Sequence, residues 1–199
     1  MKLFVFARPS LQLYLEKLLP NCPHEVDVSW LPEQTNADLH TMLQEQLAQA
    51  KGYDAVILAD GGCLLPEDGL ACPHAPLVIP RVHNAVSLLL GGAEPYRRLF
   101  DEFGGLVAWY LSGTKTEVLD CPRAECVCLG YLADTQLMLA DESISARLIA
   151  QKNNWDFFNA ECDYSLLTAL LSGDWDDDKI AVVPKGEFAK LSYNKDIIE

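Results

Sequence analysis

Three side chains that could carry chemistry occur in the middle of the sequence: Cys63, Arg81 and His83. A thiol can act as a nucleophile or a metal ligand, an imidazole titrates near neutral pH, and a guanidinium group binds anions. Arg81 and His83 follow a short apolar run at 77–79 and precede a helical pattern that begins at Asn84, a good N-cap residue. The spacing places both side chains between the end of a strand and the start of a helix, where the helix dipole favours an anion.

Alternating strand and helix patterns position these residues. Apolar runs predict strands at 3–7, 25–31, 53–59, 77–79 and 106–111, and helical spacing predicts helices at 11–19, 38–50 and 94–103. This order predicts an α/β fold with a doubly wound, mostly parallel, Rossmann-like sheet. Further helices at 141–152 and 163–171 make the C-terminal third more helical, and 180–183 with 188–191 predict a terminal hairpin or strand pair.

The domain organisation follows from the length and from this order of elements. A chain of 199 residues can bury one sizeable core. We predict a single α/β domain over 1–199, with a parallel-sheet core at 1–116 and a C-terminal cap or edge extension at 117–199.

Polar residues follow four of the predicted strands, and the carboxyl ends of parallel strands share one edge of a sheet. The candidate catalytic residues are Cys63 and His83, and the candidate ligand-binding residues are Arg8, Asp60, Arg81, Asn84, Ser112 and Thr114. Each also has a plain structural interpretation, such as a buried small side chain for Cys63 or a turn residue for Asp60. A metal site built on Cys63 and His83 needs at least about three protein ligands, which Cys128 or Asp60 would complete.

The charge of the chain argues against some partners. It carries 29 acidic and 15 basic residues, a net charge of −14, which disfavours nucleic acid and anionic membranes as main partners. No apolar run approaches the roughly 20 residues that a membrane-spanning helix needs, and the first residues do not form a signal peptide. We therefore expect a cytoplasmic protein whose seven cysteines are reduced. The oligomeric state stays open.

Several segments resemble a known family. YDAVILADGGC and APLVIPRVHNAVSLLLGGAEPYRRLF resemble the signature of the family catalogued as domain of unknown function 1638, and DYSLLTALLSGDWDDDKIAVVPKGE resembles its closing segment. The family is often associated with corrinoid-dependent methyl transfer. The resemblance therefore implies a role near one-carbon metabolism, with a metal ion or a corrinoid as cofactor and a small molecule or a methyl-transfer protein as partner. The family's typical cysteine and histidine match Cys63 and His83.

The sequence also departs from that family's pattern. Asn84 and Ala85 stand where an acidic residue and a second cysteine are usual, and Ala7 and Arg8 stand where a cysteine is common. If typical members bind a metal through these groups, the resemblance implies that the site is lost or rebuilt here.

Three functions of different classes remain open. The first is an accessory protein that binds a small anionic ligand, a cofactor or a metal near methyl transfer. The second is an enzyme with Cys63 as nucleophile, His83 as base and Arg81 stabilising negative charge, which requires a thiol of depressed pKa. The third is a structural or regulatory protein with a vestigial crevice. We rank the binding function first.

Overall fold

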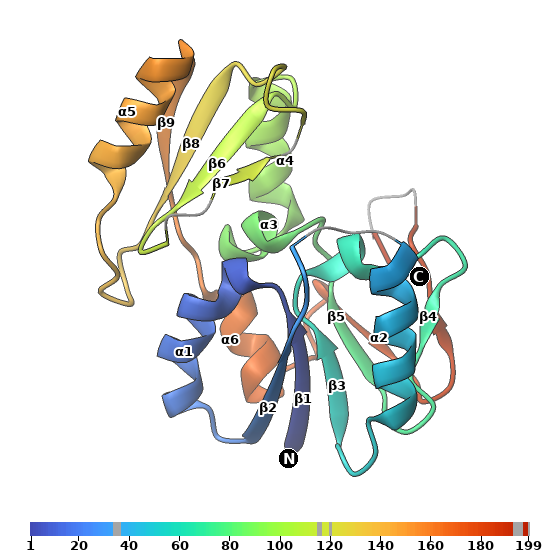
Figure 1. Ribbon diagram of the computed structural model, residues 1–199. Helices are drawn as coiled ribbons and strands as arrows, with labels where there is room; N and C mark the ends of the chain where they lie inside the picture. The colour runs from blue at the N-terminus through green and yellow to red at the C-terminus, as the bar shows by residue number, and fades with distance from the viewer. Residues whose placement is uncertain (34–36, 115–116, 120, 193–196, 199) are drawn as a thin grey trace.

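The computed structural model describes residues 1–33, 37–114, 117–119, 121–192 and 197–198, and it shows two main β-sheets arranged one above the other (Figure 1). The prediction of an α/β fold rich in parallel strands is confirmed. Among the described residues, no helix is long and apolar enough to cross a membrane.

The first sheet has five strands in the order β10-β5-β3-β1-β2. β1 (Lys2–Ala7), β2 (Glu25–Trp30), β3 (Ala55–Leu58) and β5 (Leu77–Pro80) are parallel, and β10 (Ile180–Val183) pairs antiparallel with β5. Because β2 and β3 lie on opposite sides of β1, the strand order reverses there, which is where parallel sheets open a crevice at their carboxyl ends.

The second sheet has four strands in the order β7-β6-β8-β9. β6 (Val107–Leu111), β8 (Cys128–Ala133) and β9 (Asp156–Glu161) are parallel, and β7 (Glu117–Leu119) pairs antiparallel with β6. The prediction that the strand at 106–111 extends the first sheet is therefore wrong. The segment 117–161 supplies three strands of this second sheet, and the predicted boundary residue 116 lies outside the described residues.

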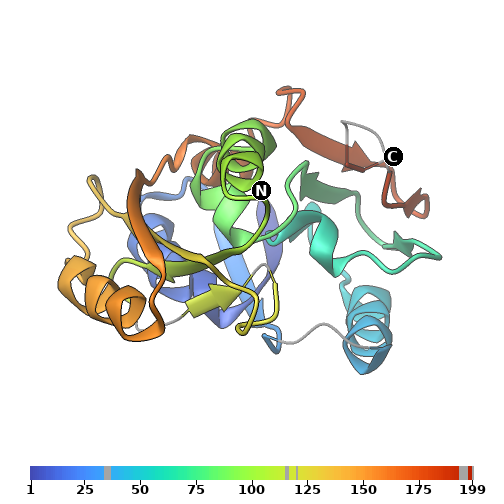
Figure 2. The same ribbon diagram turned by 90° about the horizontal axis from the view of Figure 1, so that it is seen from above.

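Helices cover both faces of the first sheet. α1 (Gln12–Leu18), α3 (Ala85–Leu89) and α6 (Ser165–Ser172) pack on one face, in a core that continues into β6 and β8 of the second sheet. α2 (Ala37–Gln49) packs on the other face. α4 (Ala93–Glu102) links the sheets, and α5 (Ser143–Asn153) covers the second sheet, on the opposite side of the molecule from α2 (Figure 2).

Two chain segments that connect the sheets lie side by side. Leu90 forms a parallel bridge with Asp163, and the Asp163 backbone N–H donates to the carbonyl of Leu89 over 2.8 Å. Gly91 has a φ of 79°, and a Cβ there would lie 2.5 Å from Asp163 Oδ2. This crossing therefore requires glycine, both for its backbone conformation and for space.

The C-terminal strands do not form the predicted hairpin. β10 pairs with β5 in the first sheet, whereas β11 (Phe188–Ala189) pairs with β4 (Leu70–Ala71) in a separate two-stranded sheet. The C-terminal segment thus returns to complete the edge of the first sheet, because β5 offers an open edge to β10.

The carboxyl ends of the two sheets approach each other. The hydroxyl of Tyr14 in α1, the helix after β1, donates to the carbonyl of Ser112 at the end of β6 over 3.1 Å. Loops that follow the strands of both sheets therefore meet between them, and this region contains most of the candidate site residues.

Candidate functional site

The structure divides the predicted site residues among three places. Arg8, Asp60 and Cys63 follow β1 and β3; Arg81, His83 and Asn84 follow β5; Ser112 and Thr114 follow β6. The prediction that all of them line one edge of one sheet is wrong for Ser112 and Thr114, because β6 belongs to the second sheet.

The first place is a buried polar cluster at the point where the strand order reverses. Asp60 is fully buried, and its Oδ2 accepts from the Arg8 backbone N–H at 3.0 Å. Burial raises the pKa of Asp60 to about 6, although the charge of Arg8 opposes this shift. The Cys63 thiol donates to the carbonyl of Asp60 at 3.2 Å. Burial, with the charge of Asp60, raises the pKa of Cys63 to about 12, so the thiol is protonated at neutral pH.

The second place is the loop between β5 and α3. Asn84 caps α3 as predicted: its Oδ1 accepts from the Ser87 N–H at 3.0 Å, and the Ser87 hydroxyl accepts from the Asn84 N–H at 3.0 Å. The Asn84 amide also donates to the Tyr96 hydroxyl at 3.3 Å. The side chain of Asn84 is therefore held by structural contacts.

His83 and Cys63 pack on different sides of the first sheet. The His83 ring is exposed and lies 5.8 Å from the ring of Tyr96, which belongs to the core under α1, α3 and α6. Partial burial, with the charge of Arg97, lowers the pKa of His83. Cys63 instead packs against the core under α2. The structure therefore does not bring the imidazole to the thiol as a nucleophile and base pair would require.

The predicted metal set is not assembled. Among the described residues, no group of three or more His, Cys, Asp or Glu side chains is arranged to hold a metal ion. Cys128 begins β8 at the amino end of the second sheet, whereas Cys63 and His83 follow the carboxyl ends of strands in the first. The described residues therefore do not bring these three side chains together, because Cys128 belongs to the other sheet and the side chains of Cys63 and His83 pack on different sides of the first.

Ser112 and Thr114 form the third place. The Thr114 hydroxyl donates to the Leu111 carbonyl at 3.2 Å, which is a local turn contact. Ser112 is buried and lines a pocket of the second sheet that none of the other predicted site residues lines.

A basic pocket lies beside Arg81. It has a volume of about 530 Å³, and its charged lining residues are four basic side chains, Arg81, Arg97, Arg98 and Lys179, and two acidic ones, Glu94 and Asp178. Arg81 is half-buried, and its guanidinium donates to the carbonyl of Ile198. Lys179 Nζ donates to the carbonyl of Gly91 at 3.1 Å. These bonds fix the cations at the wall of the pocket.

The N-terminal end of α4 forms part of the same pocket. Gly92, Ala93 and Pro95 line it, so the first turn of the helix is open to a ligand. Arg97 also forms an ion pair with Glu94 over 3.7 Å on the surface of α4, a type of contact that adds little stability. The guanidinium of Arg97 can therefore exchange this partner for a ligand at small cost.

A neighbouring pocket shares Arg97 with the basic one. It has a volume of about 410 Å³ and is lined by His83, Tyr96, Arg97, Phe100 and Asp101. α4 thus separates the surroundings of Arg81 from those of His83. Both residues that the sequence placed after β5 line pockets, and both pockets use α4 as a wall.

Sequence reasoning missed the other cations of the basic pocket. Arg97 and Arg98 belong to the polar face of an amphipathic helix, a pattern that indicates only solvent exposure. Lys179 follows the acidic run 174–178, which indicates a solvated loop. The signal that could have found them is the local excess of arginine next to Pro95 in so acidic a chain.

The fold and these pockets define an α/β protein with candidate ligand sites at the carboxyl ends of parallel strands. Residues 33–124 match the family described as "Protein of unknown function (DUF1638)", which confirms the resemblance to that family. No curated protein and no solved structure shows significant similarity to the chain. The family's description names no activity, so the association with corrinoid-dependent methyl transfer remains a hypothesis.

Proposed function

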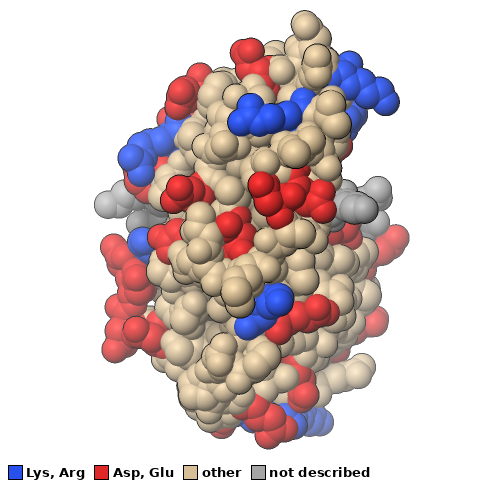
Figure 3. Space-filling model, turned by 90° about the vertical axis from the view of Figure 1, so that its left-hand side faces the viewer, with Lys and Arg blue, Asp and Glu red and all other residues tan. Residues whose placement is uncertain are grey.

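We propose that this protein binds a small anionic ligand in the basic pocket between β5, β10 and α4. The observation that carries this proposal is the concentration of Arg81, Arg97, Arg98 and Lys179 around one pocket of a chain whose net charge is −14. Acidic side chains gather across the middle of the face in Figure 3, whereas the lining of this pocket carries four basic and two acidic side chains.

The overall negative charge does not prevent anion binding. At physiological ionic strength, charges more than about 8 Å apart in solvent are largely screened, so the local cations dominate the potential inside the pocket. Arginine matches carboxylate and phosphate groups through two parallel hydrogen bonds. The open first turn of α4 adds backbone N–H groups and the positive end of the helix dipole. A carboxylate or phosphate compound is the ligand class that suits this chemistry.

The cellular role extends this proposal. The family resemblance supports an accessory role near corrinoid-dependent methyl transfer or one-carbon metabolism, with a methyl-transfer protein as partner. The strand order of the first sheet, with helices on both faces, supports a doubly wound, Rossmann-like sheet. The position of Arg81 after β5 is consistent with the ligand sites of such sheets.

The cysteine enzyme receives less support than the binding protein. A nucleophilic thiol needs a depressed pKa, whereas burial raises the pKa of Cys63 to about 12, and His83 packs on the other side of the sheet. If the crevice is vestigial, no ligand binds in the basic pocket. The phosphate titration described next distinguishes this hypothesis from the binding protein.

The test is a calorimetric titration of the full chain with inorganic phosphate at physiological ionic strength. We expect saturable binding, which Arg98→Gln and Lys179→Gln weaken by about tenfold each, as expected for the loss of a charge-assisted contact. Arg147→Gln is the matched control, because Arg147 is exposed and contacts the Phe157 ring on the second sheet. Absence of saturable binding, or an equal loss in the control variant, would falsify the proposal.

A further inference from the structure

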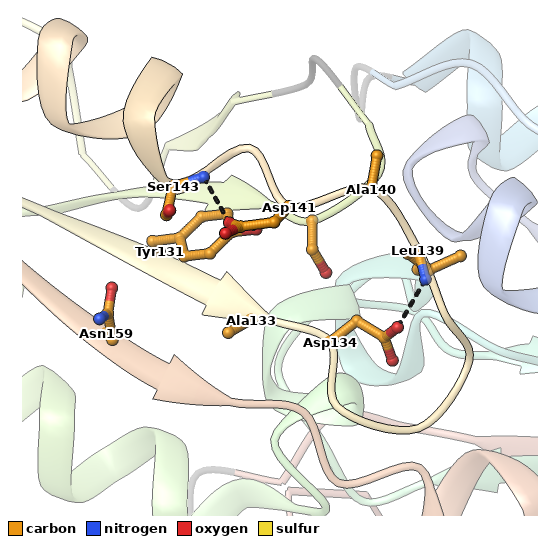
Figure 4. Close-up of a pocket in the computed structure, with 9 residues that line it drawn as sticks. Tyr131, Ala133, Asp134, Leu139, Ala140, Asp141, Ser143 and Asn159 are labelled. Atoms are coloured by element: carbon orange, nitrogen blue, oxygen red, sulfur yellow. Dashed lines mark hydrogen bonds between the residues drawn. The ribbon is translucent and has the colours of Figure 1, made fainter.

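A third pocket lies in the second sheet and is the chemical opposite of the basic one. It has a volume of about 250 Å³ and sits at the carboxyl ends of β6, β8 and β9, beside the loop that leads into α5 (Figure 4). Its polar lining residues are Ser112, Tyr131, Asp134, Asp141, Ser143 and Asn159. Among the described residues, its lining includes two aspartates and no lysine, arginine or histidine.

Both aspartates are ionised at neutral pH. Asp134 accepts from the backbone N–H groups of Gln136, Leu137 and Leu139 and from the Tyr164 hydroxyl, over 2.7–3.0 Å, and these bonds keep its pKa low against the effect of burial. Four donors nearly fill the acceptor sites of one carboxylate. Asp134 therefore shapes the pocket and gives it charge, and it has little capacity left for a ligand.

Asp141 keeps one acceptor site for a ligand. Its Oδ1 accepts from the Tyr131 hydroxyl at 3.1 Å and from the Ser143 N–H at 2.8 Å, and these contacts lower its pKa. Figure 4 shows Asp141 beside the ring of Tyr131, with Asn159 across the pocket. The Ser143 hydroxyl also contacts this carboxylate, so three of its roughly four acceptor sites are used and one is left for a cationic donor.

Ser112 supplies an independent sign of a ligand. The side chain is 1% exposed and lines the pocket. Tyr14 and Cys162 lie near its Oγ, but no described residue forms a well-aligned hydrogen bond with it. Buried hydroxyl groups are nearly always hydrogen-bonded, because leaving one unpaired costs free energy. A ligand group that can donate to or accept from Ser112 Oγ would recover this energy.

We propose that this pocket binds a small amino alcohol in its ammonium form, at a site separate from the anion site. The ammonium group pairs with the Asp141 carboxylate close to the ring of Tyr131, and the ligand hydroxyl bonds to Ser112 Oγ. Because no basic side chain from the described part of the chain lines the pocket, its two negative charges favour a cation over a neutral polyol. The arrangement does not favour a metal ion, because Asp134 has little acceptor capacity left and no group of three ligating side chains exists among the described residues.

The test compares ethanolamine with ethylene glycol, a neutral compound of nearly the same size, by NMR titration of the full chain. We expect ethanolamine to bind at least tenfold more tightly than ethylene glycol, with shifts at Ser112, Tyr131 and Asp141. Addition of salt should weaken ethanolamine binding, because the attraction is electrostatic. Equal affinities, no binding of ethanolamine, or preferential binding of Mg²⁺ at these residues would overturn the proposal.

Two variants separate the site from general effects on folding. Asp141→Asn removes the charge but keeps an acceptor for Tyr131 and Ser143, and Ser112→Ala removes only the buried hydroxyl; each should weaken ethanolamine binding by about tenfold. Asp156→Asn is the matched control, because Asp156 is exposed at the amino end of β9 and does not line the pocket. Unchanged affinity in Asp141→Asn, with the far-UV spectrum preserved, would exclude this site. Phosphate binding at the basic pocket should be the same in all three variants.

Discussion

The loop that follows β8 depends on one carboxylate. Asp134 Oδ1 accepts from the N–H groups of Gln136 and Leu137 and from the Tyr164 hydroxyl, and Oδ2 accepts from the Leu139 N–H at 2.7 Å. In Asp134→Asn one oxygen becomes an NH₂ group. If that NH₂ group takes the place of Oδ2, it cannot accept from the Leu139 N–H, and this hydrogen bond is lost. The three bonds to Oδ1 then go to a neutral instead of a charged acceptor.

The expected loss of stability follows from these contacts. An unpaired, partly buried N–H costs about 1–3 kcal/mol, and a bond that changes from a charged to a neutral acceptor loses roughly 1 kcal/mol. Solvent reaches this half-buried side chain and reduces these costs. We expect Asp134→Asn to lower the free energy of unfolding by about 2–4 kcal/mol at pH 7. Exposed Asp176→Asn is the matched control and should change it by less than about 0.5 kcal/mol.

The pH dependence tests the same reasoning. The pKa of Asp134 is lower in the folded chain than its ordinary value of 3.8, so its stabilising effect is present above about pH 4 and is lost as the pH falls through the folded pKa. The difference between wild type and Asp134→Asn in urea unfolding should therefore shrink from pH 7 to pH 3. A difference below about 0.5 kcal/mol at pH 7, or one that grows on acidification, would refute this account.

Three further predictions concern other parts of the chain. Burial raises the folded pKa of Asp60 from 3.8 to about 6, so its charge should cost the folded state roughly 3 kcal/mol above pH 6. In urea unfolding, Asp60→Asn should therefore be more stable than wild type at pH 8, and this difference should vanish near pH 4. With its raised pKa, Cys63 should resist iodoacetamide at pH 7 in the native protein and react fully in urea, as peptide mass spectrometry can show; rapid native labelling would contradict this. Gly91→Ala should lower the melting temperature more than Gly104→Ala, because both have positive φ but only the first places a Cβ 2.5 Å from Asp163; equal effects would contradict the close crossing.

Much of the fold could be predicted from the sequence. The predicted strands and helices before residue 112 all exist, because each carries a clear apolar period and clear end signals such as Gly52, Pro80 and Asn84. The N-cap at Asn84 is a local property of side chain and backbone, and the structure confirms it. Local patterns therefore sufficed wherever a segment's own residues determine its conformation.

The division into two sheets could not be predicted in the same way. Buried parallel strands have similar apolar sequences in any sheet, so the residues 106–111 do not indicate which strands β6 pairs with. β8 and β9 contain Cys128, Gly130 and Asn159, which weaken the strand pattern, so the partners of β6 were not recognised. Because β8 and β9 were not predicted, β6 was assigned to the first sheet.

The candidate site was predicted in part for the same reason. Arg81 and His83 were found because they follow a strand and precede a helix, and both line pockets. Their separation from Cys63 depends on which face of the sheet each side chain packs against, which is a tertiary property. Lys179 reaches Arg81 only because β10 pairs with β5, far along the chain.

The central claim is that an anion binds beside Arg81, and a phosphate titration followed by ¹H–¹⁵N NMR of the full chain tests it most directly. We predict saturable shifts of backbone amides confined to 81–83, 92–98 and 178–180. Shifts centred instead on Arg8, Asp60 and Cys63, or no saturable shifts at all, would contradict the claim.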